Sequence, residues 1–158
     1  MPNEVSLTLL DAMRFRVRTG SGHEMTIDAS PDVGGVNAGP RPMELQLAAL
    51  AGCASMDVIS ILRKMRQDVT AYACHAAGET ASEHPKRYTR IVVTHRLRGR
   101  AIAEANVRRA LHLSMSRYCP VFAMLSPGVP ISVRYEIEDE AGGVAVPGEV
   151  GLGEPGAA

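Results

Sequence analysis

The chain has 158 residues, of which 46% are hydrophobic, and this is enough for one folded domain with a hydrophobic core. Lysine plus arginine and aspartate plus glutamate number 17 each, and this balance argues against nucleic acid or an anionic membrane surface as a partner. A net charge of zero also leaves little repulsion between copies of the chain, so the composition favours self-association.

The N-terminal residues predict strands followed by a loop. Apolar and polar side chains alternate over residues 4–18, as is typical of a half-buried strand, and we expect a bend near Asp11. The Thr-Gly-Ser-Gly turn at 19–22 leads to a returning strand at 23–28. Residues 29–41 are rich in Gly, Pro, Asp and Asn, so we expect a loop there.

A long helix is predicted from Pro42 to about Arg66. Proline suits the first helical position, and Glu44 suits the first turn because the positive end of the helix dipole favours acidic side chains. The first half of this helix is apolar almost all round, which predicts burial on every side. Its most apolar stretch, residues 45–56, is shorter than the roughly 20 residues of a membrane span. We therefore expect a buried core helix and no membrane partner.

The remaining elements complete an α+β pattern. We expect strands at 69–79 and 88–97, an amphipathic helix at 101–118, a short helix at 121–125 and a last strand at 131–137. From Glu138 onward the chain becomes rich in Gly, Ala and Pro. We therefore expect one domain over residues 1–139 and a mobile tail over 140–158. The expected order is two strands, a helix, two strands, one or two helices and a final strand, and this order fits an α+β domain.

Cysteines are the residues of this chain best suited to chemistry. Cys53 lies inside the long predicted helix, and Cys119 follows the second one, directly before Pro120. A proline that opens a helix places Cys119 near a helix N-terminus, where a thiolate is favoured. If the fold brings these two thiols together, one can attack an oxidant and the other can close a disulfide with it. Cys74 lies in a predicted strand and is expected to be a core or sheet-surface residue.

The cysteine count also bears on the compartment. Three cysteines are an odd number, and the chain opens on Met-Pro-Asn-Glu without the features of a signal peptide. We therefore expect a cytoplasmic protein, in which a pair of cysteines is more often catalytic or metal-bound than structural.

Two other interpretations of the cysteines stay open at this point. Cys53 and Cys119 are also compatible with inert core and turn positions. A zinc site made of Cys53, Cys119 and a histidine is possible, although the chain has no C-x-x-C or H-x-x-x-H spacing. Asp57 lies four residues after Cys53, on the same helical face, and its charge disfavours a thiolate there. A reactive Cys53 would therefore need a cation from elsewhere in the fold.

Two motifs around the cysteines suggest a family. The first comprises Pro-Met-Glu-Leu at 42–45, Ala-Ala at 48–49, Gly-Cys at 52–53 and Asp-Val at 57–58; the second is Tyr-Cys-Pro-Val at 118–121. Together they resemble the OsmC/Ohr superfamily of bacterial thiol peroxidases for organic hydroperoxides. Residues 57–66 are most similar to the OsmC-like subgroup that contains YhfA-type proteins. The resemblance covers about residues 4–138.

The resemblance implies a fold and a set of partners. The fold would be an intertwined homodimer in which antiparallel sheets are wrapped around two long central helices. The substrate would be an organic hydroperoxide, and a cellular dithiol would be the reductant. No cofactor and no metal would be needed.

The resemblance also implies roles for residues. Cys53 corresponds to the attacking thiol and Cys119 to the thiol that closes the disulfide. In the peroxidases a glutamate next to a proline helps to position a catalytic arginine. Here the carboxylate comes one residue later, at Glu44, and one residue turns a side chain by about 100° around a helix. Arg18 and Arg41 are the nearest candidates for the arginine.

The sequence thus predicts a thiol-dependent peroxidase that reduces organic hydroperoxides. Two other classes of function stay open. One is a non-catalytic ligand-binding protein that keeps the fold and an apolar pocket. The other is a thiol-based redox sensor, in which a peroxide drives disulfide formation without catalytic turnover.

Overall fold

A computed structural model describes residues 3–143 and 145–152 of the chain. The chain forms two compact units, residues 1–46 and residues 47–158. Helix α1 (Pro42–Lys64) begins in the first unit and continues into the second. Each unit contains its own β-sheet. Together these elements make an α+β fold, as the sequence predicts.

The first unit is a three-stranded antiparallel sheet in the order β1-β2-β3. Its strands are β1 (Val5–Asp11), β2 (Arg14–Thr19) and β3 (Glu24–Ile27). The prediction of a single bent strand over residues 4–18 is wrong, because the chain reverses at Ala12, where φ is 42°. A two-residue turn preserves the alternation of faces, so Leu9 pairs with Phe15 and the apolar pattern continues through the reversal.

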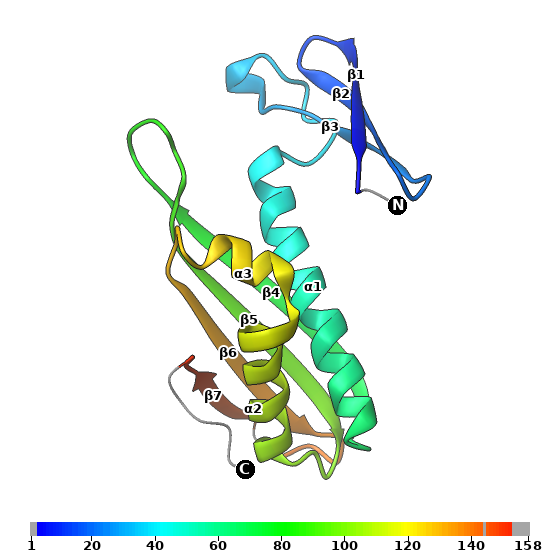
Figure 1. The fold of residues 1–158 in the computed structure, drawn as a ribbon, viewed down its shortest axis with the longest axis vertical. Coiled ribbons are helices and arrows are strands. Elements are labelled where there is room, and N and C mark those ends of the chain that lie inside the picture. Colours follow the sequence, from blue (N-terminus) through cyan, green and yellow to red (C-terminus); the bar gives the residue numbers. More distant parts are fainter. Residues whose placement is uncertain (1–2, 144, 153–158) are drawn as a thin grey trace. The chain divides into compact units, whose positions relative to one another are not determined.

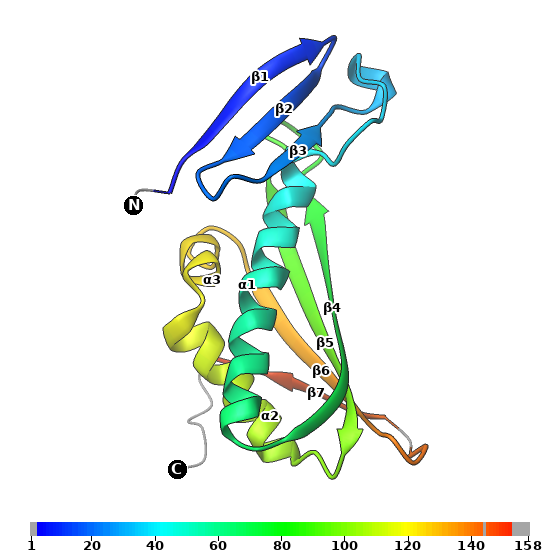
Figure 2. The same cartoon turned by 90° about the vertical axis from the view of Figure 1, so that its right-hand side faces the viewer.

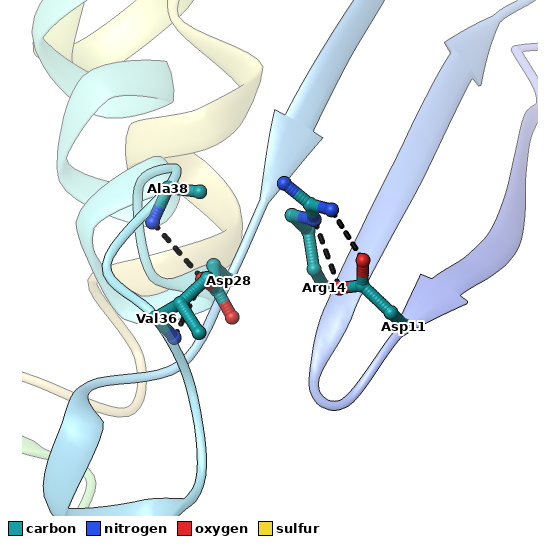
Figure 3. Close-up of polar contacts among 5 residues, drawn as sticks. All are labelled: Asp11, Arg14, Asp28, Val36 and Ala38. Carbon is teal, nitrogen blue, oxygen red and sulfur yellow. Dashed lines mark hydrogen bonds and ion pairs between the residues drawn. The ribbon is translucent and has the colours of Figure 1, made fainter.

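A buried aspartate organises the loop that follows β3. The carboxylate of Asp28 accepts hydrogen bonds from the backbone N–H groups of Ala29 at 2.8 Å and of Val36 and Ala38 at 3.0 Å each. Figure 3 shows the bonds from Val36 and Ala38, and beside them the ion pair between Arg14 and Asp11. The pKa of Asp28 is lowered, and the hydrogen bond from the N–H of Ala38 contributes most to this shift. The loop, which includes the short 3₁₀ helix η1 (Pro31–Val33), is thus ordered around one charged side chain.

The second unit contains a four-stranded sheet in the order β4-β5-β6-β7. Its strands are β4 (Asp68–Thr80), β5 (Tyr88–Arg100), β6 (Ile131–Asp139) and β7 (Val146–Val150). Strand β5 pairs with β6 in parallel, so the sheet is mixed rather than antiparallel throughout. Parallel neighbours need a long crossover, and the helices between β5 and β6 supply it.

Helices cover one face of this sheet. They are α1, α2 (Glu104–Leu113) and α3 (Pro120–Leu125), and a π-helical segment, η2 (Ser114–Tyr118), continues α2. Figure 1 and Figure 2 show α1, α2 and α3 on the same side of the strands. Alternate residues of β5, among them Ile91, Val93 and Leu97, are buried and form part of the core of this unit.

Helix α1 is less buried than its composition predicts. Only Leu50, Val58 and Leu62 of its 23 residues are buried, and Met56 is 76% exposed. By length and composition alone α1 could cross a membrane, with a mean hydropathy of 1.7 over an 18-residue window. Its three buried residues belong to the core of the second unit, so we interpret it as a core helix with an apolar face left uncovered in a single chain.

The C-terminal residues differ in part from the expected tail. The prediction of a mobile tail from residue 140 is wrong for residues 146–150, because these form β7 and pair with β6 from Val133 to Ile137. Gly148 lies directly over Tyr135, and a Cβ at this position would be 2.1 Å from the Tyr135 ring, which only glycine avoids. Residue 144 and residues 153–158, which the predicted tail also includes, lie outside the described residues.

Candidate functional site

The fold brings the two candidate thiols together with one carboxylate. The Sγ atoms of Cys53 and Cys119 and a carboxylate oxygen of Asp57 all lie within 4.8 Å of one another. All three residues belong to the second unit, so a single chain forms the cluster. We call Cys53, Asp57 and Cys119 the thiol–carboxylate cluster.

Local structure explains this arrangement. Cys53 and Asp57 are four residues apart on α1, so their side chains lie on the same helical face. Cys119 is the residue between η2 and α3, and its extended backbone ends one helix and starts the next. The π-helical turns of η2 shift the chain relative to a regular helix, a feature frequent at functional sites.

Two residues outside the cluster donate hydrogen bonds to it. The hydroxyl of Ser114, the first residue of η2, donates to Oδ2 of Asp57 at 3.0 Å. The backbone N–H of Phe122 donates to Sγ of Cys119 at 3.3 Å. Ser114 is 1% exposed and Cys119 is 3% exposed, so both contacts are shielded from water. Two of the three cluster residues are therefore fixed by buried donors.

The pKa of the Cys119 thiol is higher than its place at a helix N-terminus predicts. Its place at the start of α3 is as expected, and the N–H of Phe122 favours the thiolate. Burial acts more strongly in the opposite direction, however, and Cys53 and Asp57 add to it, so the pKa of Cys119 rises to about 11. Cys119 is thus mainly a protonated thiol at neutral pH, whereas Cys53 is only half-buried.

A cavity of about 430 Å³ lies beside the cluster. It is lined by Asp57, Ser60, Ile61, Lys64, Met65, Leu113 and Tyr118. Its walls therefore combine apolar side chains with one carboxylate and one ammonium group. A small organic molecule fits a space of this size and composition.

The other predicted site residues belong to the first unit. Arg18 pairs across the strands with Glu24, with Nε donating to Oε1 at 2.8 Å. Glu44 accepts a hydrogen bond at 2.8 Å from the backbone N–H of Arg41, the residue before α1. This is the contact of a capping box, which stabilises the start of a helix. The thiol–carboxylate cluster contains none of these three residues, and their part in catalysis stays a prediction.

Comparison with known proteins identifies the family. The family model described as OsmC-like protein matches residues 35–134, which include both cysteines of the cluster. The chain is also 35% identical to protein YhfA of Escherichia coli K12 over 128 residues, which cover 81% of this chain and 92% of YhfA. The chain belongs to the OsmC-like protein family.

Solved structures agree with this OsmC-like assignment. A hypothetical protein from Aquifex aeolicus VF5 is 31% identical, with a TM-score of 0.77 over 89% of this chain and 98% of that one. A protein of Legionella pneumophila described as an organic hydroperoxide resistance protein OsmC has a TM-score of 0.63 at 11% identity, over 87% and 96% of the two chains. At that identity the second likeness shows the shared fold alone.

The OsmC-like chain also buries a second polar group, which sequence reasoning missed. Nδ1 of His95 on β5 lies 2.5 Å from the hydroxyl of Tyr72 on β4, and this hydroxyl donates to Ser55 on α1 at 3.1 Å. Burial lowers the pKa of His95 to about 4, so its ring is neutral at physiological pH. Cys74 faces the same group and is half-buried, and burial raises the pKa of its thiol. The alternation along β4 and β5 is the only sequence signal that places these side chains on the helix-facing side.

Proposed function

We propose that this OsmC-like protein reduces organic hydroperoxides with its two clustered thiols. In the first step the sulfur of Cys53 attacks the distal oxygen of the hydroperoxide, the O–O bond breaks and an alcohol leaves, so that Cys53 becomes a sulfenic acid. In the second step the thiol of Cys119 attacks that sulfur, a disulfide forms and water leaves. A cellular dithiol then reduces the disulfide by exchange and is itself oxidised.

The observation that carries this proposal is the proximity of the two sulfur atoms. Both lie within 4.8 Å of the same carboxylate oxygen and of each other, although the residues are far apart in the chain. A disulfide needs the sulfur atoms at about 2 Å, so the two side chains must still move toward each other for the bond to form.

The assignment of roles rests on exposure. Cys53 is half-buried and Cys119 is buried, so an oxidant reaches Cys53 more readily. Burial also keeps Cys119 protonated, so it is the weaker competitor for the first attack on the peroxide. Cys53 is therefore the attacking thiol and Cys119 the resolving thiol.

The cavity supports an organic rather than an inorganic peroxide. Ile61, Met65 and Leu113 give it apolar walls, against which an alkyl or aryl group can pack. Organic hydroperoxide resistance is the role named for the Legionella pneumophila protein and for a protein of Elizabethkingia anophelis with 13% identity and a TM-score of 0.64. These names support the substrate class that we propose here.

A cation near Cys53 would be needed to stabilise the thiolate against Asp57. Lys64 lines the same cavity as Asp57 and is one candidate. Arg18 and Arg41 are the others, with Glu44 as the residue that would position them. In this proposal Arg18 or Arg41 can come from the second chain of a dimer.

Uncovered apolar surface in each unit supports a homodimer. In the second unit Met56 of α1 is 76% exposed. In the first unit Val5, Leu7 and Leu9 of β1 are 63%, 51% and 56% exposed. A second copy of the chain would cover such surfaces, and a homodimer in the cytoplasm, where dithiol reductants act, completes the proposal.

A turnover assay tests the proposal. Cumene hydroperoxide is mixed with the reduced protein and dithiothreitol, and loss of peroxide is compared between wild type, Cys53→Ser, Cys119→Ser and the matched control Cys74→Ser. We expect Cys53→Ser to lose turnover, Cys119→Ser to lose most of it and Cys74→Ser to keep it. Equal turnover by wild type and Cys53→Ser would contradict the proposal.

A redox sensor is the second candidate, and the environment of the thiols favours it. Burial, together with the neighbouring Cys53 and Asp57, holds Cys119 in the protonated form, which slows the resolving step. A sensor tolerates slow chemistry because it needs only one oxidation per signal. Disulfide formation with stoichiometric peroxide, but without turnover in the assay above, would point to this function.

A further inference from the structure

The thiol–carboxylate cluster has the donor set of a metal site. Thiolate sulfur and carboxylate oxygen are both zinc ligands, and zinc sites with three protein ligands leave a fourth position for water. Soft thiolates favour zinc over magnesium or calcium. Cys53, Asp57 and Cys119 each offer one ligand atom, and these atoms lie within 4.8 Å of one another.

The geometry is close to what a tetrahedral zinc ion requires. With Zn–S bonds of about 2.3 Å and Zn–O bonds of about 2.1 Å, the ligand atoms around zinc are separated by about 3.4–3.8 Å. Cys53 and Asp57 stand one helical turn apart and can bind one ion together. Cys119 approaches from the neighbouring segment, between η2 and α3.

Contacts outside the cluster match those of a metal centre. The ligand carboxylate of Asp57 accepts a hydrogen bond from buried Ser114, and the sulfur of Cys119 accepts one from the N–H of Phe122. Such outer donors orient ligands and are part of most metal sites. The cavity that Asp57 lines offers an ion a route toward the cluster.

We infer that Cys53, Asp57 and Cys119 form a zinc-binding site, and that zinc binding and the Cys53–Cys119 disulfide exclude each other. On binding, Zn²⁺ replaces the two thiol protons, which go to the solvent, and no electron is transferred. The two thiolates and the carboxylate carry three negative charges that the dication offsets. A disulfide uses both sulfur atoms, so the oxidised protein has lost two of its three ligands.

This inference does not depend on peroxidase turnover. Zinc held at the cluster would keep both thiols reduced and unavailable to a peroxide, and oxidation would release the metal. The same three residues would then give a redox-dependent metal site.

Cobalt binding tests the inference, because Co²⁺ occupies zinc sites and gives a thiolate-to-metal charge-transfer band. Reduced protein is titrated with Co²⁺ under anaerobic conditions, and then with Zn²⁺. We expect one Co²⁺ per chain with a thiolate band that Zn²⁺ removes. Cys53→Ser and Cys119→Ser should lose most of the band, whereas the matched control Cys74→Ser should keep it.

The carboxylate is tested separately. Asp57→Asn should weaken cobalt binding at least roughly tenfold, and Ser114→Ala should weaken it by about tenfold through the lost outer contact. Circular dichroism establishes that each variant is folded. Unchanged affinity in folded Asp57→Asn, or loss of the band in Cys74→Ser, would overturn the assignment of the site.

A protection experiment on the wild-type protein needs no variant. One equivalent of Zn²⁺ should slow alkylation of Cys53 and Cys119 by iodoacetamide, as measured by peptide mass spectrometry, and leave the rate at Cys74 unchanged. Protein oxidised with diamide should bind no Zn²⁺. Equal alkylation of the cluster thiols with and without zinc would contradict the inference. If the protein forms the disulfide and turns over peroxide but binds no metal, the zinc site is refuted and the proposed peroxidase function stands.

Discussion

Asp57 lies one helical turn beyond Cys53 on α1, with its carboxylate within 4.8 Å of both cluster thiols. A negative charge at this distance opposes the formation of a thiolate, and this is the unfavourable feature of the site for peroxide chemistry. The same charge is favourable for a divalent cation. The structure supports this effect for Cys119, whose pKa Asp57 helps to raise.

Removal of this charge should speed up oxidation. We expect Asp57→Asn to react with cumene hydroperoxide roughly threefold to tenfold faster than wild type, because a like charge nearby disfavours the thiolate. Stopped-flow measurement of sulfenic acid formation under single-turnover conditions gives the rate. Glu138→Gln, which removes an exposed carboxylate on β6, is the matched control and should leave the rate unchanged. A slower reaction in Asp57→Asn would mean that the carboxylate assists the attack instead.

Burial of neutral His95 should make the protein less stable in acid. The folded protein holds the pKa of His95 at about 4, while an unfolded chain has the ordinary value of 6.5. Between these values the unfolded state binds more protons, so stability falls as the pH falls. The loss from pH 7 to pH 4 should be on the order of 3 kcal/mol from this residue.

Denaturant unfolding of wild type and His95→Gln at several pH values measures this effect. The His95→Gln variant should lose less stability than wild type over the same range, whatever its stability at pH 7. Parallel curves for the two proteins between pH 4 and pH 6.5 would show that His95 does not titrate as described.

The loop after β3 should depend on Asp28. Asp28→Ala removes the acceptor for the N–H groups of Val36 and Ala38, so their amide hydrogens should exchange faster. The melting temperature should fall as well, because two backbone donors lose their charged partner. Val33→Ala, at an exposed position of the same loop, is the control. Unchanged exchange at both amides in Asp28→Ala would contradict this role.

The exposed apolar face of α1 should be an interface. Met56→Glu places a charge on that face, and burial of an unpaired charge is costly, so we expect the proposed dimer to dissociate. Light scattering with size-exclusion chromatography measures the mass, and the monomer is 16.9 kDa. Ser82→Glu, which adds the same charge in the exposed loop between β4 and β5, should stay dimeric. A dimer of unchanged stability in Met56→Glu would place the interface elsewhere.

Local sequence signals predicted most of the secondary structure. The start of α1 follows from Pro42 and from Glu44 in the first turn, and the structure adds that Glu44 caps the helix. Strands β4, β5 and β6 follow from alternating side chains, and the structure confirms them. These features depend on residues close together in the chain.

Features that depend on distant residues were harder to predict. Strand β7 has a composition typical of a tail, and its pairing with β6 is a tertiary contact in which Gly148 fits over Tyr135. The hydrogen bond from Ser114 to Asp57 joins two helices across the fold. The raised pKa of Cys119 comes mainly from burial, which a local motif does not reveal. The resemblance to the OsmC/Ohr superfamily paired Cys53 with Cys119, whereas composition and periodicity alone did not.

One measurement tests the central claim most directly. Reduced protein is treated with a slight excess of cumene hydroperoxide, blocked with iodoacetamide and digested without reduction, and the peptides are identified by mass spectrometry. We predict a single cross-link that joins Cys53 to Cys119, with Cys74 alkylated. Sulfinic or sulfonic acid at Cys53 with Cys119 still alkylated, or a cross-link that involves Cys74, would contradict the proposed chemistry.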